Sequence, residues 1–247
     1  TSTLQAYASP VIGKMDVALI ETAHIMRVLD PVWHTKAETA SRLRGRVEAI
    51  LDWATVHRYR TGDNPARWKG HLEALLPARS KVSKAKHFAA LPWRDMKPFM
   101  AELRKQNGIG ALALQFTILT AARSGEVRGM EWYEVDFEQR LWTVPGERMK
   151  AGREHRVPLS NAAVELLEQL KAVKLADTET VFPSVRDHKP LSDMTLTAVL
   201  RRMQRGDITV HGFRSSFRDW DAEATDYPQE MAEMALEHIV GNKGEAA

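Results

Sequence analysis

The chain has 247 residues, enough for two domains that each bury a core, and its 44% hydrophobic and 27% charged residues argue against disorder. It has no cysteine, no apolar run near the roughly 18 residues that span a bilayer, and no secretory signal in its first residues, so disulfides, thiolate metal sites and membrane contact are not expected. The lack of cysteine favours a reducing compartment, and we expect a cytoplasmic protein.

The net charge of +3 is unevenly distributed along the chain. Residues 1–90 carry 14 Lys and Arg against 8 Asp and Glu, whereas residues 91–247 carry 21 against 24. A basic first third favours a polyanionic partner, although a solvated helical surface would have the same composition. Charge alone leaves both interpretations open.

Hydrophobic periodicity predicts three helices in the first part of the chain, over residues 15–30, 36–59 and 64–77. The second is amphipathic, and its arginines lie mostly off the apolar face, where they are candidates for contacting a polyanion such as DNA: Arg42, Arg44 and Arg46. Residues 79–90 are basic and without periodicity, which predicts a linker with three further candidates: Lys81, Lys84 and Lys86.

A second unit follows the linker. A helix over 92–108 precedes a run, 109–122, that is apolar nearly all round and should form a central buried helix. After a tight polar turn at 123–130, alternating stretches predict an antiparallel sheet of three strands: 131–137, 140–145 and 155–160. Four more helices are expected over 161–174, 194–203, 211–224 and 229–237. The fold class is therefore mainly α with a small antiparallel sheet, divided into a helical domain (1–78), a linker (79–90) and a larger domain (91–247).

Several polar residues occupy positions that do not suggest ordinary surface. Arg123 follows the buried helix, where it would either neutralise the helix dipole or serve a site, and Glu126 is placed to pair with it. Lys150 lies at the tip of a hairpin that turns at Ala151 and Gly152. A lysine there is usually a solubilising charge, but the ribbon also carries Arg148, Arg153 and Arg156, and a basic ribbon can enter a DNA groove.

His211 and Arg214 open a helix on one face of its first turn, where backbone N–H groups already favour an anion. A salt bridge from Arg214 to a nearby acid is an equally good interpretation of that pair alone. His238 ends the last helix, where a histidine is favoured by the helix dipole. Together with Arg123 and Lys150, however, these residues form a cationic set that suits the charge developing on a phosphodiester during its cleavage.

A metal-dependent nuclease would need clustered acids. The best pair, Asp219 and Asp221, is two residues apart on a helix and does not share a face, so we expect neither a metal nor a cofactor.

The order Arg, Lys, His-x-x-Arg, His resembles that of the tyrosine recombinases, and among them the phage and genomic-island integrases. The matching stretches are "LTAARSGEVRGMEW", "ERMKAGREHRVPLS", "HGFRSSFRDW" and "ALEHIVGNK", within a resemblance that spans about residues 15–247. It implies a core-binding domain and a catalytic domain that clamp duplex DNA. It also implies that Arg123 and Arg214 bind the scissile phosphate, that Lys150 protonates the 5′-hydroxyl leaving group and that His211 accepts a proton. His238 would hydrogen-bond the phosphate and Glu126 would brace Arg123.

The sequence departs from this family in two ways. The arm-binding domain that such integrases usually carry at the N-terminus is not in the chain. The family's nucleophilic tyrosine follows the last histidine by nine or ten residues, which corresponds to Ala247 or the next position, and none of the four tyrosines follows His238. The nucleophile is therefore expected just after Ala247, and this chain is expected to bind DNA without cleaving it.

The resemblance thus implies site-specific DNA recombination by metal-independent strand cleavage through a phosphotyrosine intermediate, with double-stranded DNA as the partner. A tetramer on DNA is expected for the full-length protein and a monomer for this chain. A DNA-binding regulator that kept the fold without catalysis remains an alternative, as does a metal-dependent nuclease.

Overall fold

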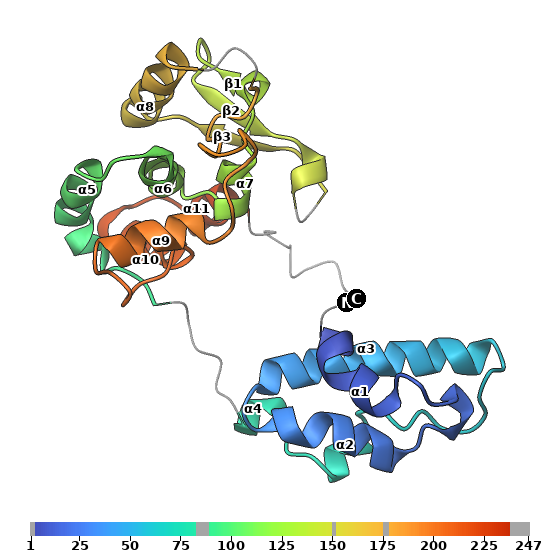
Figure 1. Ribbon diagram of the computed structural model, residues 1–247. Coiled ribbons are helices and arrows are strands. Elements are labelled where there is room, and N and C mark those ends of the chain that lie inside the picture. The colour runs from blue at the N-terminus through green and yellow to red at the C-terminus, as the bar shows by residue number, and fades with distance from the viewer. Residues whose placement is uncertain (1–2, 83–88, 150–151, 175–177, 238–247) are drawn as a thin grey trace. The chain divides into compact units, whose positions relative to one another are not determined.

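The computed structural model describes residues 3–82, 89–149, 152–174 and 178–237 (Figure 1). The chain divides into two compact units, residues 1–87 and 88–247, each with a separate hydrophobic core. Within the described residues, no helix is both long and apolar enough to traverse a bilayer.

The first unit is built on two helices, α2 (Thr22–Trp33) and α3 (Ala37–Val56), that pack against each other. Both were expected, although α2 begins seven residues later than predicted because residues Val17–Leu19 form a 3-10 turn instead. Short helical segments at Leu4–Ala8, α1 (Ser9–Ile12) and α4 (Arg79–Val82) complete the unit. Its core is lined by Leu29, Trp33 and Leu43, all nearly inaccessible to solvent.

The predicted third helix over residues 64–77 is wrong, because only a 3-10 turn forms there, at Leu72–Ala74. The Asn64 side chain competes with helical bonding, since its Nδ2 donates to the Glu48 carbonyl of α3 at 2.8 Å and its Oδ1 accepts from the Ala66 N–H at 2.9 Å. Gly70 then adopts a positive φ of 73°, outside the right-handed helical region. The segment therefore runs as a loop fastened to α3.

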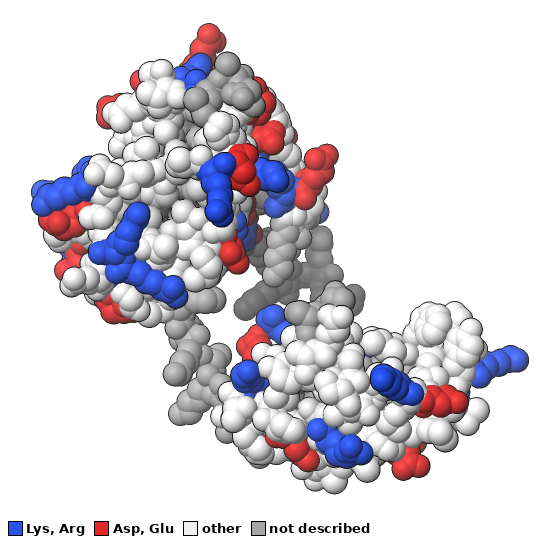
Figure 2. All heavy atoms as spheres, viewed as in Figure 1, with Lys and Arg blue, Asp and Glu red and all other residues white. Residues whose placement is uncertain are grey.

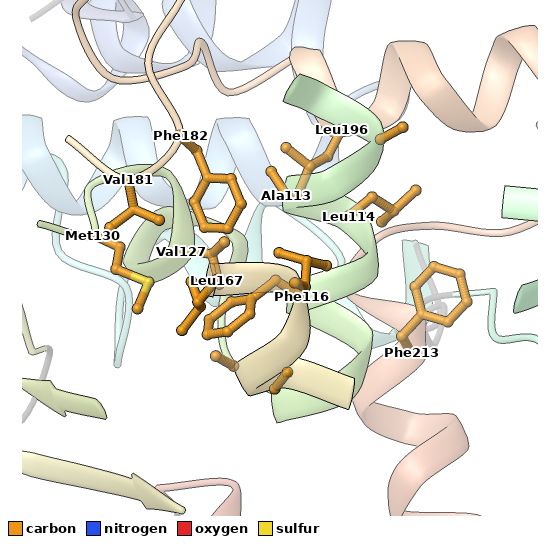
Figure 3. Packing of buried hydrophobic residues seen from close by; sticks show 14 of the residues in the cluster. Ala113, Leu114, Phe116, Val127, Met130, Leu167, Val181, Phe182, Leu196 and Phe213 are labelled. Carbon is orange, nitrogen blue, oxygen red and sulfur yellow. The ribbon is translucent and has the colours of Figure 1, made fainter. Parts of the chain in front are cut away.

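In the second unit, α6 (Ile109–Thr120) is the central buried helix that its composition predicts. It packs against α5 (Met96–Arg104), α7 (Ser124–Arg128), α8 (Asn161–Ala172) and α9 (Thr195–Arg202). Figure 3 shows Phe116 of α6 among aliphatic and aromatic side chains from these and neighbouring segments. Its ring centroid lies 5.5 Å from that of Trp142 and 5.6 Å from that of Phe182, so this aromatic group joins α6 to the sheet.

The sheet is antiparallel, with the order β1 (Val135–Asp136), β2 (Leu141–Val144), β3 (His155–Pro158). Trp142 of β2 pairs with both Val135 and Val157, and Val144 pairs with His155. Between β2 and β3 the chain makes a 3-10 turn at Gly146–Arg148. The predicted fold class, mainly helical with a small three-stranded antiparallel sheet, is confirmed.

Two more helices follow, α10 (Gly212–Ala224) and α11 (Gln229–Ala235), close to their predicted positions. The segment 123–130 is a correction: it was expected to be a turn, and it contains the short helix α7. The difference arises because the Glu126 side chain accepts the backbone N–H of Arg123 at 2.9 Å, which caps a new helical turn.

Candidate active site

Arg123 lies between two helices. Helix α6 ends at Thr120, the C-cap residue Ala121 turns the chain with a φ of 50°, and Arg123 then takes an extended conformation as the N-cap residue of α7. Its Nη1 donates to Glu126 Oε1 at 2.9 Å, while its backbone N–H donates to the other oxygen of the same carboxylate. Arg123 thus follows the C-terminus of α6, where the dipole favours a cation, and also precedes the N-terminus of α7, where the dipole disfavours one. Glu126, which is 5% exposed, fixes the guanidinium.

Arg214 projects from the first turn of α10 and is 6% exposed. Its guanidinium donates to the carbonyl of Ala121 at 2.6 Å and to the carbonyl of Leu236, so it links the α6–α7 junction to the end of α11. The sequence had also allowed a salt bridge from Arg214 to a nearby acid, but the partners observed are backbone carbonyls. Burial, reinforced by the charge of Arg123, lowers the pKa of Arg214 to about 10. The group therefore remains charged at neutral pH in a poorly hydrated position.

His211 occupies the N-cap position of α10 and is exposed, while its carbonyl accepts the Arg214 N–H at 3.1 Å. The structure therefore places His211 one turn from Arg214, as their spacing predicts.

Three residues of the predicted site set, Arg123, Glu126 and Arg214, are brought into one charged cluster.

Two further residues in this cluster were missed by sequence reasoning: His155 and Glu237. The Glu237 carboxylate forms an ion pair with Arg123, and its other oxygen lies 3.6 Å from His155 Nε2. Glu237 follows α11 with a positive φ of 55°, and its side chain is 8% exposed. The only sequence signal for His155 was its place on the basic ribbon, and nothing in the sequence indicated Glu237.

Burial lowers the pKa of His155. The negative charge of Glu126 opposes this effect, whereas the charges of Arg123 and Arg214 add to it. All three of these residues therefore act electrostatically on the same imidazole, which begins β3 and is 18% exposed.

The arginines predicted to contact DNA from α3 have different surroundings. Arg42 is exposed and pairs with Glu38 at 2.6 Å. Arg44 is 15% exposed, pairs with Glu48 at 2.6 Å and donates to a backbone carbonyl of the 64–77 loop. Arg46 is exposed and donates to the Thr3 hydroxyl. Arg44 is thus held in contacts within its own unit, which leaves Arg42 and Arg46 as the accessible members of this set.

The predicted ribbon arginines also divide into two kinds. Arg148 is 26% exposed, forms an ion pair with the fully buried carboxylate of Glu134 and donates to the Glu126 carbonyl at 2.5 Å. Arg153 and Arg156 are exposed, and Arg156 pairs with Glu154 at 2.9 Å. Arg148 therefore fastens the ribbon to α7, while the other two are accessible.

The remaining predicted residues, namely Lys84, Lys86, Lys150 and His238, lie outside the described part of the chain, as does the side chain of Lys81. On the face drawn in Figure 2, basic and acidic side chains are interspersed over each unit, so no region of a single charge covers that face. Among the described residues of the second unit, the Arg123–Arg214 cluster binds the carboxylates of Glu126 and Glu237 and is therefore suited to an oxyanion.

Two known protein families match parts of the chain. Residues 1–71 match the phage integrase central domain, and residues 91–239 match the phage integrase family. The integrase of Enterobacteria phage P4 is 32% identical over 99% of this chain, and the prophage integrase IntZ of Escherichia coli K12 is 31% identical over 96%. The chain spans 58% of the length of each of these curated relatives.

Solved structures share the fold at lower sequence identity. A lambda integrase fragment (75–356), bound as a dimer to a COC′ core site, has a TM-score of 0.69 at 20% identity, over 96% of this chain and 82% of that one. A Tn1549 transposon integrase fragment in complex with circular intermediate DNA has a TM-score of 0.70 at 12% identity, over 96% and 84%. The family match across most of the second unit and the similarity to the phage P4 integrase establish that the chain belongs to the phage integrase family of tyrosine recombinases.

Proposed function

We propose that the protein carries out site-specific DNA recombination by metal-independent strand cleavage and transfer through a phosphotyrosine intermediate. The observation that carries the proposal is that Arg123 and Arg214 lie close enough for their charges to interact, while Arg123 already binds the Glu237 carboxylate and Glu126 fixes its guanidinium. Two cationic groups held before substrate arrives can stabilise a phosphorane-like transition state without reorganising. The integrase relatives of phage P4 and Escherichia coli support this assignment.

In this mechanism the two guanidiniums hold the non-bridging oxygens of the scissile phosphate. A tyrosine oxygen attacks phosphorus, the bond to the 5′ oxygen breaks, and the 3′ side of the strand remains attached to the enzyme. Lys150 supplies the proton that the departing 5′ oxygen takes up, and His211 accepts the proton lost by the nucleophile. His238 donates a hydrogen bond to the phosphate.

We further propose that none of the chain's own tyrosines is this nucleophile. Tyr59, Tyr133 and Tyr227 are more than half exposed, and the Tyr7 hydroxyl accepts a hydrogen bond from Lys36 at 3.0 Å in the first unit. On this proposal the chain binds duplex DNA and forms no covalent adduct with it. An adduct on a nicked duplex, mapped to Tyr227, would overturn that part of the proposal.

Duplex DNA is the proposed partner of both units. Residues 1–78 would serve as the core-binding domain, 79–90 as a linker and 91–247 as the catalytic domain. Arg42, Arg46, Arg153 and Arg156 are accessible for phosphate contacts, whereas Arg44 and Arg148 hold their own units together. We expect a monomer in solution and, for the full-length protein, a tetramer on DNA. One structural neighbour is a lambda integrase tetramer bound to a Holliday junction.

The chemistry can be tested on this chain with an external nucleophile. A duplex is first selected from a random pool by its binding to the chain. Hydrogen peroxide is then supplied in the presence of EDTA, so that hydroperoxide attacks phosphorus in place of tyrosine. The proposal predicts strand cleavage that leaves a 5′-hydroxyl end, which a polynucleotide kinase can label. Arg123→Ala and Arg214→Ala should each slow cleavage by at least about 100-fold, as for removal of a comparable transition-state donor.

Duplex affinity should change little in the same two variants, because most of it comes from many other phosphate contacts. Arg201→Ala, which removes an exposed arginine of α9, serves as the matched control and should retain full cleavage. Binding without any peroxide-dependent cleavage would favour a DNA-binding regulator. Cleavage that appears only with magnesium would favour a metal-dependent nuclease.

A further inference from the structure

The cluster around Arg123 contains an anion supplied by the protein itself. The Glu237 carboxylate places one oxygen on the Arg123 guanidinium and the other 3.6 Å from His155 Nε2. At 8% exposure the carboxylate is almost completely enclosed, and it is held from two sides by groups on α7 and β3. The side chains around it therefore define a position that accepts an oxyanion.

Strand β3 orients the His155 side chain toward this position. Along β3, exposure alternates between partly buried His155, exposed Arg156 and buried Val157, so His155 lies on the core-facing side of the strand. Its backbone register is fixed by pairing with Val144 of β2. The imidazole is therefore partly buried and held by a paired strand, whereas the neighbouring Arg156 side chain is exposed to solvent.

We propose that His155 is a further phosphate-binding residue of the active site, with its Nε2 and the Arg123 guanidinium contacting the same DNA phosphate at the position now taken by the Glu237 carboxylate. This inference rests on the function proposed above. The Glu237 side chain leaves as the phosphate enters, so one oxyanion replaces another. His155 Nε2 then donates a hydrogen bond to a non-bridging oxygen, next to the oxygens held by Arg123 and Arg214.

The electrostatic surroundings of His155 determine how it responds to an anion. Arg123 and Glu126 face it from α7, Arg214 from α10 and Glu237 from the end of α11. Burial and the two arginines lower its pKa in the free protein. A phosphate bound within hydrogen-bonding distance favours the charged imidazolium, so it raises that pKa. Duplex binding should therefore strengthen as the pH falls through the titration range of His155.

The direct test is an NMR titration of the whole chain with ¹⁵N-labelled histidine rings. Ring resonances are followed from pH 5 to pH 8, with and without the selected duplex at saturation, and His155→Asn identifies the signal of interest. We expect the duplex to raise the pKa of His155 by about one pH unit, the lower end of shifts caused by a neighbouring opposite charge. His155→Leu should remove the corresponding pH dependence of duplex affinity, up to about tenfold in Kd.

The competing interpretation is that His155 merely anchors Glu237. Under that interpretation the duplex leaves its pKa unchanged or lowers it, and His155→Leu alters stability without altering the pH dependence of binding. Either result overturns the inference.

The two proposals fail in distinguishable ways. If peroxide-dependent cleavage requires Arg123 and Arg214 but the pKa of His155 does not move, the His155 assignment falls and the proposed function stands. If cleavage is absent, or if it occurs and depends on neither arginine, the proposed function falls and the inference falls with it.

Discussion

Arg214 shows how a single residue connects separate parts of the second unit. It comes from α10, yet its donors reach the carbonyls of Ala121, at the end of α6, and of Leu236, at the end of α11. Binding to neutral carbonyls keeps the guanidinium in place without neutralising it. Its charge is thereby available to an incoming anion, whereas Arg123 already pairs with Glu126 and Glu237.

Glu237 competes with that anion, and this leads to a prediction. Glu237→Gln preserves the shape of the side chain but removes the charge held by Arg123. We expect the selected duplex to bind severalfold more tightly, because a phosphate no longer displaces a carboxylate from the arginine. Fluorescence anisotropy at fixed salt measures the change. Weaker binding by this variant would mean that Glu237 supports the site and does not compete for it.

A second residue-scale prediction concerns the start of α10. A Cβ on Gly212 would lie 2.2 Å from the carbonyl oxygen of Ala89, a backbone atom that cannot move aside cheaply. Gly212→Ala should therefore displace α10 and destabilise the second unit by about 1–3 kcal/mol, as overpacking does. Urea denaturation checks the value. Gly206→Ala is the matched control, because its Cβ would enter open space, and it should change the free energy of unfolding little.

At the scale of elements, the β2–β3 ribbon is held in place by interactions among Glu134, Trp142 and Arg148. The buried Glu134 carboxylate accepts from Trp142 Nε1 at 2.9 Å and pairs with Arg148, which also bonds the Glu126 carbonyl. Burial raises the pKa of Glu134, against the opposing effects of Trp142 and Arg148. Arg148 therefore sets the position of the ribbon relative to α7, and so relative to Arg123.

Arg148 and Arg153 should consequently behave differently when replaced. Arg148→Ala leaves the Glu134 carboxylate buried without its cation, so we expect a loss of about 3–5 kcal/mol in the free energy of unfolding. Arg153→Ala removes an exposed side chain and should leave stability unchanged while lowering the salt dependence of DNA binding by about one ion. Thermal denaturation and anisotropy at several salt concentrations measure the two effects. Equal stability of the two variants would refute the bracing role of Arg148.

The elements also show which parts of the fold a sequence determines. Periodicity identified α3, α6, β2 and β3, because their burial follows the local pattern, whereas the strand predicted over 131–137 is limited to Val135–Asp136 after a 3-10 turn at Trp132–Glu134. It failed at 64–77, where Asn64 bonds to α3 through contacts that no local pattern contains, and at 123–130, where one capping carboxylate creates α7. Likewise Arg123, Glu126 and Arg214 could be predicted from motifs, whereas His155 and Glu237 join the site only through tertiary packing.

At the scale of the whole molecule, the chain carries two units with separate cores, and the anion-binding cluster lies entirely within the second. Most of the first unit matches the phage integrase central domain, and most of the second matches the phage integrase family. We expect exposed basic residues of both units to provide sequence-independent affinity for DNA, and the small Arg123–Arg214 cluster to provide the chemistry. Binding and cleavage should therefore respond to different substitutions.

The central claim is that Arg123 contacts one particular DNA phosphate, and a double-mutant cycle tests it most directly. Each phosphate near the cleavage position of the selected duplex is replaced in turn by a neutral methylphosphonate, and Kd is measured for the wild-type chain and for Arg123→Ala. We predict a coupling energy of about 1 kcal/mol at a single phosphate, the net contribution of a typical hydrogen bond, which is compatible with a small change in total affinity. Zero coupling at every phosphate would contradict it.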